Sequence, residues 1–140
     1  PFIVEHVRRT TSLPLDVHLM VTNPEHHLKT FADAGADSLT VHVEATQEIL
    51  PILERIHNLG CSAGVTLNPA TPASALVDSI RLADLILVMT VHPGYSGQAF
   101  MPDMVAKVET SFLSLLWLVT FASLLFYGSN ISFPPYYDFN

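Results

Sequence analysis

Four short apolar runs recur along the chain at nearly constant intervals, and this regularity limits the possible folds more than any other feature. The intervals are 23, 24 and 23 residues, for runs that begin near Leu15, Ser38, Ser62 and Leu85. An interval of this length holds one strand and one helix of a compact βα unit. Successive βα units place their strands in a parallel sheet covered by helices, so we predict an α/β fold.

The segments between the runs contain residues that begin and end helices. Asn23-Pro24-Glu25 combines an N-cap, a proline at the first helical position and an early acid, which predicts a helix that runs to Ala34 and stops at Gly35. Similar signals predict helices between Pro51 and Gly60 and over residues 73–79 after Thr71-Pro72, and the helical spacing of Phe2, Ile3 and Val7 predicts the end of a helix over residues 2–9. An Ala-Asp pair precedes two of the apolar runs, at Ala36-Asp37 and Ala83-Asp84.

Polar side chains alternate with apolar ones in three of the runs. The faces that carry the polar groups hold Asp16, His18 and Met20, then Thr40, His42 and Glu44, then Ser62, Gly64, Thr66 and Asn68. The apolar faces must pack on helices, whereas the polar faces suit the interior of a barrel whose mouth holds a site. An open doubly wound sheet favours apolar residues on both faces, as in the run at Leu85. The pattern therefore favours a barrel and leaves the open sheet as an alternative.

Length, charge and cysteine content narrow the possible partners. The 140 residues suit one modest domain with a core. Acidic residues outnumber basic ones by 13 to 6 without any basic block, so nucleic acid is not an expected partner. Cys61 is the single cysteine, which excludes an internal disulfide and is typical of a buried side chain in a reducing compartment. With no secretory signal at the N-terminus, we expect a cytoplasmic protein.

The segment from Val91 to Phe100 follows the fourth run and precedes a predicted helix start at Met101-Pro102-Asp103. Two residues separate Gly94 from Gly97, a spacing that lets backbone N–H groups converge on an anion, with added attraction from the positive end of the next helix. A phosphate is the ligand that this arrangement favours. An ordinary strand-to-helix turn explains the spacing equally well.

Five strings together resemble the ribulose-phosphate 3-epimerase family, in its order and at its spacing, from about Phe2 to Val108. They are LPLDVHLM (residues 13–20), AGAD (34–37), TVHVE (40–44), AGVTLNPATP (63–72) and VHPGYSGQAF (91–100). The resemblance implies a (β/α)8 TIM barrel, of which residues 1–109 would supply about strands three to six. It also implies an isomerase of the pentose phosphate pathway, which interconverts ribulose 5-phosphate and xylulose 5-phosphate by moving a proton at C3. The anion bound by the glycine loop would then be the substrate phosphate.

The resemblance assigns roles to individual residues. His18 matches one ligand of a divalent metal, which the family binds with two histidines and two aspartates, and imidazole suits zinc, iron or manganese. His42, Glu44 and Asn68 are expected to support the site from outside the ligand set. The substrate-binding residues implied are His18, Met20, Met89, Gly94, Tyr95, Ser96 and Gly97. The family often has Gly-Phe-Gly-Gly in the loop, so Tyr95 and Ser96 are departures.

The two aspartates that the family uses as metal ligands and as acid and base have no match here, because the matched segment lies between them. Removing a proton beside a ketone builds negative charge on oxygen, which a cation stabilises, and epimerisation needs a proton-transfer group on each face. We therefore assign no catalytic residue and predict that this chain alone lacks epimerase activity. An incomplete barrel has unpaired edges, so we expect marginal stability or association into a homo-oligomer.

The family pattern ends near Glu109, and residues 110–140 form a segment of different character. No charged residue occurs from Thr110 to Tyr137, and the run from Phe112 to Tyr127 is almost entirely apolar. The run falls short of the roughly 17–20 residues of a membrane helix. A buried helix, a membrane anchor and sequence foreign to the family are the three interpretations, and the last is favoured. Two alternative functions stay open: a relative acting on allulose 6-phosphate, and a non-catalytic, membrane-anchored phosphate-binding fragment.

Overall fold

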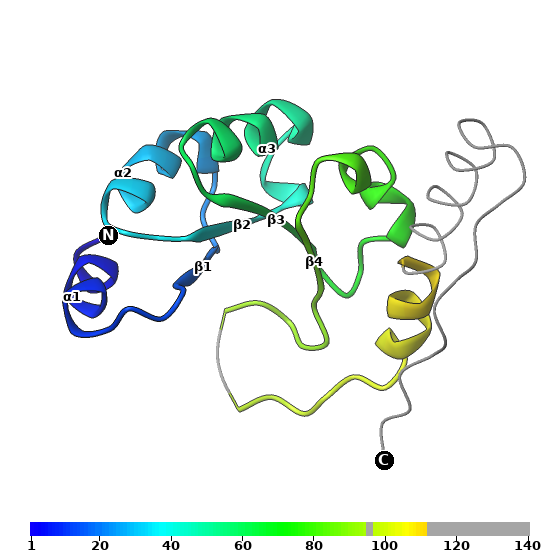
Figure 1. Cartoon of the computed structure of the whole chain (residues 1–140). Coiled ribbons are helices and arrows are strands. Elements are labelled where there is room, and N and C mark those ends of the chain that lie inside the picture. Colours follow the sequence, from blue (N-terminus) through cyan, green and yellow to red (C-terminus); the bar gives the residue numbers. More distant parts are fainter. Residues whose placement is uncertain (95–96, 112–140) are drawn as a thin grey trace, which may run out of the picture.

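The computed structural model describes residues 1–94 and 97–111, in which strands alternate with helices and 3-10 turns (Figure 1). The strands are β1 (Asp16–Leu19), β2 (Ser38–His42), β3 (Ser62–Leu67) and β4 (Leu85–Val88). The helices are α1 (Phe2–Thr10), α2 (Leu28–Asp33) and α3 (Ile49–Asn58), and residues 104–111 are also helical. The 3-10 turns are η1 (Pro24–His26), η2 (Val43–Ala45), η3 (Ala73–Leu76) and η4 (Ser79–Arg81).

The strands form one parallel sheet in the order β1-β2-β3-β4. Their pairing keeps the order of the apolar runs, with Asp16 paired with Ser38 and Ser38 paired with Ser62. On the last pair of strands, Gly64 lies opposite Leu85. Sequential parallel strands need a crossover over one face for each connection. The predicted α/β fold built from repeated βα units is confirmed.

The apolar core lies between the sheet and the helices. Figure 1 shows α2 and α3 on the same side of the strands. Each of the two helices sends fully buried leucine or isoleucine side chains to the sheet. The fully buried members of the core are Leu28, Leu39, Val41, Leu53, Ile56, Ala63, Val65 and Leu67. The alternate residues that the sequence assigned to the helix-facing side of β2 and β3 therefore form the core.

The opposite face of the sheet carries the polar residues. Thr40, His42 and Thr66 are buried on this face, even though all three have polar side chains. Gly64 permits close approach of β2 and β3, because an added Cβ would collide with Thr40 Oγ1 and lie 2.9 Å from Thr40 Cβ. A doubly wound sheet carries helices on both faces, whereas the wall of a parallel barrel carries them on its outer face alone. The described residues thus have the architecture of part of a barrel.

The two Ala-Asp pairs join the amino ends of neighbouring strands. Asp37 Oδ2 accepts hydrogen bonds from the Leu15 backbone N–H at 2.7 Å and from Arg8 Nη1 at 2.8 Å. Asp84 Oδ2 accepts one from the Ala63 N–H at 2.8 Å and lies 2.8 Å from His57 Nε2. The repeat seen in the sequence is therefore a repeated strand junction.

Cys61 is a buried structural side chain, as the sequence indicates. It is 5% exposed, and its thiol Sγ donates to the Ala36 carbonyl at 3.2 Å. Burial raises the pKa of the Cys61 thiol, and the charge of Asp37 raises it further. A thiol with a raised pKa is a poor nucleophile at neutral pH.

Two predicted helices differ from the structure in their type. The segment after Asn23 begins as η1 and becomes α-helical only at Leu28, and Asn23 itself adopts a left-handed φ of 51° without a side-chain cap. Residues 73–79 form η3 and the start of η4 in place of an α-helix. Thr71 does not cap η3, because its hydroxyl donates to Glu44. At η3, a contact with the neighbouring βα unit thus replaces the predicted cap.

The apolar run from Phe112 to Tyr127 lies outside the described residues, as does most of the predicted segment 110–140. Residues 110 and 111 continue the helix that begins at residue 104. Within the residues that the structure describes, no helix has the length and apolar character needed to cross a bilayer.

Candidate active site at the carboxyl ends of the strands

The predicted site residues gather at one end of the sheet. His18 lies within β1 and Met20 directly follows that strand, while His42 ends β2. Asn68 and Met89 follow β3 and β4 in the same way. Because the carboxyl ends of parallel strands meet at one edge, these residues from four βα units are neighbours. This is the end at which parallel barrels carry their sites.

A cavity of about 380 Å³ opens at this end. It is lined by the segment after β1, the end of β2, the residue after β3 and the loop after β4. Its lining residues are Met20, Val21, Thr22, His42, Glu44, Ala45, Asn68, Pro93 and Gly94. Of the predicted substrate-binding residues, Met20 and Gly94 line it directly. His18 is connected to it through His42.

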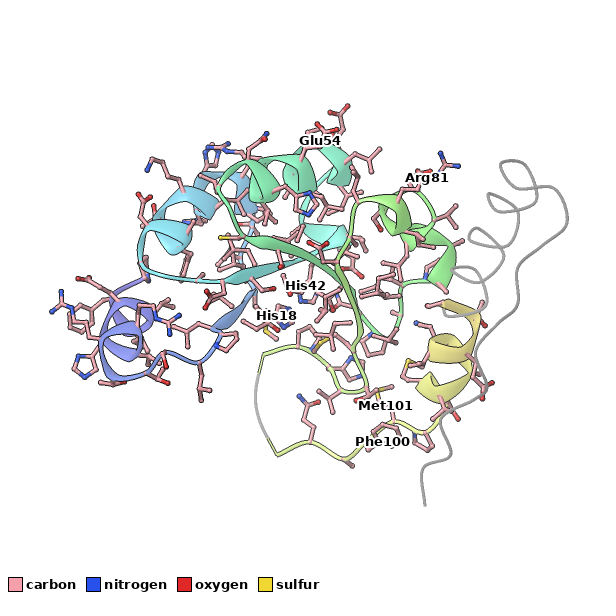
Figure 2. All side chains as sticks on the ribbon, viewed as in Figure 1. His18, His42, Glu54, Arg81, Phe100 and Met101 are labelled. Atoms are coloured by element: carbon pink, nitrogen blue, oxygen red, sulfur yellow. The ribbon has the colours of Figure 1, made fainter. Side chains whose placement is uncertain are left out.

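His18 and His42 meet on the face of the sheet opposite α2 and α3 (Figure 2). Their Nε2 atoms are 2.8 Å apart, so one nitrogen donates a hydrogen bond to the other. Burial lowers the pKa of His18, the neighbouring His42 lowers it further, and Asp16 acts in the opposite direction. His18 is therefore held as a neutral imidazole at neutral pH, the form that can bind a metal ion.

Glu44 joins the end of β2 to the loop after β3. Its Oε1 accepts from the Asn68 backbone N–H at 2.8 Å and from the Thr71 hydroxyl, and its Oε2 lies 3.3 Å from His42 Nδ1. Burial by itself would raise the pKa of Glu44, but hydrogen bonds from Thr71, Asn68 and His42 outweigh it and lower the pKa below its usual value. The carboxyl group is thus ionised at neutral pH.

The glycine loop leaves β4 and returns to it. Gly94 and Gly97 have φ values of +124° and +77°, which L side chains rarely adopt, and a Cβ at either position would meet no described atom within 4 Å. The Gln98 side chain closes the loop by bonding both the N–H and the carbonyl of His92, at 3.2 and 2.6 Å. The Met101 N–H then returns to the Thr90 carbonyl at 2.9 Å. Tyr95 and Ser96 lie outside the described residues.

The two methionines differ in their surroundings. Met20 is 51% exposed and lines the cavity, whereas Met89 is 8% exposed and its backbone N–H bonds the Leu67 carbonyl at 3.1 Å. Met20 can therefore touch a ligand, while Met89 is packed into the protein. The sequence predicts the same role for both methionines, because each directly follows a strand.

Two buried oxygen atoms lack a partner near the same end. Thr66 Oγ1 and Asn68 Oδ1 make no hydrogen bond to any described residue. An unpaired buried acceptor costs free energy unless a ligand or water satisfies it. Since Asn68 lines the cavity, its amide oxygen can accept a hydrogen bond from a bound hydroxyl group.

The donor set for a metal is incomplete within the described residues. No group of three or more histidine, cysteine, aspartate or glutamate side chains is arranged to hold a cation there. Asp16 is on the same face as His18 but its Oδ1 accepts from Thr40 Oγ1 at 3.4 Å. His18 can offer one nitrogen donor to a divalent metal, and the described residues do not complete a donor set around it.

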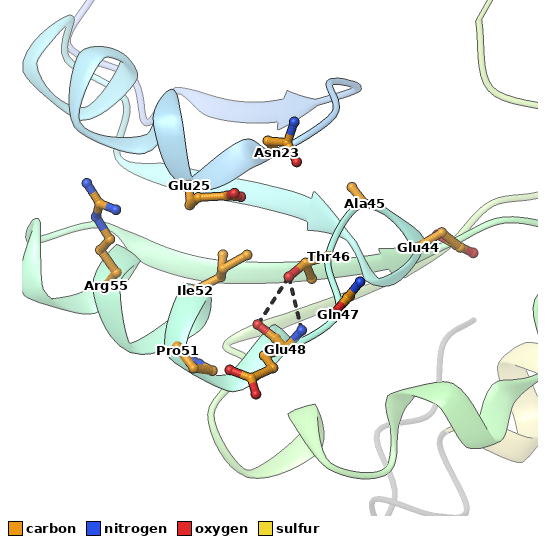
Figure 3. A pocket seen from close by; sticks show the side chains of 10 residues that line it. All are labelled: Asn23, Glu25, Glu44, Ala45, Thr46, Gln47, Glu48, Pro51, Ile52 and Arg55. Carbon is orange, nitrogen blue, oxygen red and sulfur yellow. Dashed lines mark hydrogen bonds between the residues drawn. The ribbon is translucent and has the colours of Figure 1, made fainter.

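A second and larger cavity, of about 640 Å³, lies between η1, η2 and α3 (Figure 3). It is lined by Asn23, Glu25, Glu44, Ala45, Thr46, Gln47, Glu48, Pro51, Ile52 and Arg55. Three glutamates and one arginine give its wall a net negative charge. No residue predicted to bind the substrate or a metal lines it.

Sequence reasoning missed two residues that hold the site together. Thr71 looks like a helix cap because Pro72 follows it, yet its hydroxyl binds Glu44. Lys107 Nζ donates to the carbonyls of Pro69 and Thr71 at 2.6 and 2.7 Å. No local signal marks Lys107, because its partners lie far away in the sequence.

Comparison with known proteins gives one consistent result. The model of the "Ribulose-phosphate 3 epimerase family" matches residues 1–112. Ribulose-phosphate 3-epimerase of Bacillus subtilis is 45% identical over 109 residues, which cover 78% of this chain and 50% of that protein. The chloroplastic ribulose-5-phosphate-3-epimerase of Arabidopsis thaliana is 44% identical over 111 residues, which cover 78% and 40%. The chain therefore spans about half the length of the curated relatives it matches.

Proposed function

The chain belongs to the ribulose-phosphate 3-epimerase family, and on that basis we propose that the cavity at the carboxyl ends of its strands binds a pentulose phosphate. The observation that carries the proposal is that Met20, His42 and Gly94, from three different βα units, line one cavity. In parallel barrels the substrate binds among the loops at this end. These residues would form one part of the binding site.

In this proposal the loop at Gly94 and Gly97 holds the phosphate through its backbone N–H groups. Positive φ values in a short loop allow successive N–H groups to point at one anion. Backbone donors suit a chain that has only six basic residues. Tyr95 and Ser96, which lie between the glycines, would add hydroxyl donors.

The sugar end of the ligand would face His18, Met20 and Asn68. His18 would supply one nitrogen to a divalent cation, for which zinc, iron and manganese are suitable. Such a cation, when bound, stabilises negative charge on the substrate oxygens as the C3 proton leaves. Asn68 Oδ1 would accept from a sugar hydroxyl, and Met20 would exclude water from one side of the sugar.

Proton transfer on the two faces of the substrate needs two groups, and the two aspartates that the family resemblance assigns to this task have no match in this chain. We therefore propose that the 140-residue chain binds ribulose 5-phosphate without converting it to xylulose 5-phosphate. Product formation above background by the purified chain, with manganese and ribulose 5-phosphate, would contradict this part of the proposal.

Binding is tested by following backbone amide chemical shifts while ribulose 5-phosphate is added. We expect shifts at Met20, Gly94 and Gly97. Gly97→Ala should weaken binding roughly tenfold or more, because a charge-assisted hydrogen bond is worth about 1.5–3 kcal/mol. Gly60→Ala is the matched control, since Gly60 also has a positive φ and open surroundings but lies beyond α3. Equal weakening by the two substitutions would contradict the proposal.

A further inference from the structure

A chain of hydrogen bonds connects Glu44 to His18 through His42. Glu44 Oε2 lies 3.3 Å from His42 Nδ1, and His42 Nε2 lies 2.8 Å from His18 Nε2. His42, the middle residue of the three, is 7% exposed, so water has little access to these hydrogen bonds. Figure 2 shows the two histidines side by side on the polar face of the sheet. Both ring nitrogens of His42 thus have a protein partner.

The partners decide where the protons are. An ionised carboxylate only accepts hydrogen bonds, so His42 Nδ1 must carry the proton that faces Glu44. If that proton is the only one on His42, its Nε2 is unprotonated and accepts from His18, so His18 carries its proton on Nε2. We infer that Glu44, acting through His42, fixes His18 in the Nε2–H tautomer and leaves Nδ1 as its free donor nitrogen. This inference rests on the proposed function only where it treats His18 as a metal ligand.

Joint binding of one metal ion by both Nε2 atoms is the competing interpretation. The ring centroids are 4.9 Å apart, much farther than the two nitrogens, so the rings meet tip to tip. A metal ion on the line between facing nitrogens needs about 2.0–2.1 Å on each side, or a gap of about 4 Å. The observed 2.8 Å leaves room for a proton alone. His42 is therefore a positioning residue and His18 is the ligand.

Glu44 is itself held by the neighbouring βα unit. Its other oxygen accepts from the Asn68 N–H at 2.8 Å and from the Thr71 hydroxyl. Lys107 in turn bonds the carbonyls of Pro69 and Thr71. The tautomer of a residue in β1 thus depends on groups that follow β2 and β3. Such outer partners orient metal-binding histidines and raise their basicity.

Nitrogen NMR of the 140-residue chain, labelled with ¹⁵N-histidine and free of metal at neutral pH, tests the inference directly. We expect His18 to show a protonated Nε2 and an unprotonated Nδ1, and His42 the reverse. Substitution of each histidine in turn assigns the signals. A His18 with its proton on Nδ1, or a His42 protonated on both nitrogens, would overturn the inference.

Glu44→Gln tests whether the hydrogen bonds from Glu44 through His42 to His18, here called the relay, set the tautomers, or whether packing alone does. A carboxamide can donate as well as accept, so it no longer dictates the proton position on His42, and both histidines should become mixtures of tautomers. Glu48→Gln is the matched control, because Glu48 is exposed and takes no part in the relay. A folded Glu44→Gln protein with unchanged histidine signals would contradict the role of Glu44.

Manganese chloride distinguishes the relay from the proposed metal site. Mn²⁺ bound to His18 should broaden the Nδ1 signal before any other histidine nitrogen, and Glu44→Gln should weaken this binding roughly tenfold. If the tautomers are as expected and Mn²⁺ leaves Nδ1 sharp, the relay stands and the metal-ligand proposal fails. If Mn²⁺ broadens Nε2 of both histidines together, the relay fails and shared coordination replaces it.

Discussion

The two faces of the sheet are built from the same strands but have opposite characters. On the helix-facing side, Leu39, Val41 and Val65 have no exposed surface and belong to the apolar core. On the other side, a hydrogen bond joins His18 and His42, and the Thr66 hydroxyl has no partner among the described residues. Free energy of folding comes mainly from the first face, because it is proportional to the apolar area removed from water. The second face can carry chemistry because the first supplies the stability.

The largest effect should come from truncating the helix-facing side. Leu53→Ala in α3 removes a fully buried side chain and should lower the free energy of unfolding by about 2–5 kcal/mol. Urea denaturation followed by circular dichroism measures this. Leu50→Ala, in the same helix but 37% exposed, should cost much less. Equal losses for the two variants would show that the core does not lie where the structure places it.

A smaller effect should follow from filling the close contact on the polar face. Gly64→Ala would place a Cβ against the Thr40 hydroxyl and 2.9 Å from Thr40 Cβ, so β2 and β3 must separate, at a cost of about 1–3 kcal/mol. The double substitution with Thr40→Ala should recover part of the loss, since it removes the hydroxyl and leaves Cβ. A double-mutant cycle in urea gives the coupling. Complete additivity would contradict the contact.

These contrasts explain what the sequence could predict about the fold. Strand residues alternate between faces, so the polar and apolar sets of β1, β2 and β3 follow directly from the order of residues. The Ala-Asp repeat likewise predicts that the amino ends of neighbouring strands are joined in the same way at two places in the sheet. The 3-10 form of η1 and η3 could not be predicted from the local signals: Asn23 makes no side-chain cap, and the Thr71 hydroxyl bonds Glu44 instead of capping η3.

The candidate site was predictable to a similar degree. The family strings assign His18, Met20 and Gly94 to one place, and all three lie at the carboxyl end of the sheet. The sequence cannot separate Met20 from Met89, because both directly follow a strand although one is exposed and the other buried. Nor can it reveal that His18 contacts His42, since register between strands is set by the whole sheet.

The Asp84 carboxylate at its strand junction should contribute about 1 kcal/mol to the free energy of unfolding, and this contribution should depend on pH. It is smaller than the usual value for a charged hydrogen bond because Asp84 is exposed to solvent. The Ala63 N–H and then His57 lower the pKa of Asp84 below its reference of 3.8. The stabilisation is therefore complete above about pH 4 and is lost as pH falls through the lowered pKa.

The unfolding free energies of wild type and Asp84→Asn should accordingly differ at pH 7 and converge in acid. Urea denaturation at a series of pH values measures the difference. Asp33→Asn is a suitable control, because Asp33 pairs with Lys29 on the exposed surface of α2, a kind of pair worth about 0.3–0.5 kcal/mol. A difference for Asp84→Asn that persists at pH 2 would mean that the substitution acts through packing and not through the carboxylate.

The smallest effect on stability should come from Met20→Ala, and it tests the division between the faces most sharply. Met20 is 51% exposed, so the free energy of unfolding should change by less than about 0.5 kcal/mol. Met89→Ala, at 8% exposure, should cost several times more. Ribulose 5-phosphate binding should respond in the opposite order, since Met20 lines the cavity and Met89 does not. If Met89→Ala weakened binding more than Met20→Ala while the protein stayed folded, the ligand would lie deeper than the cavity, against β4.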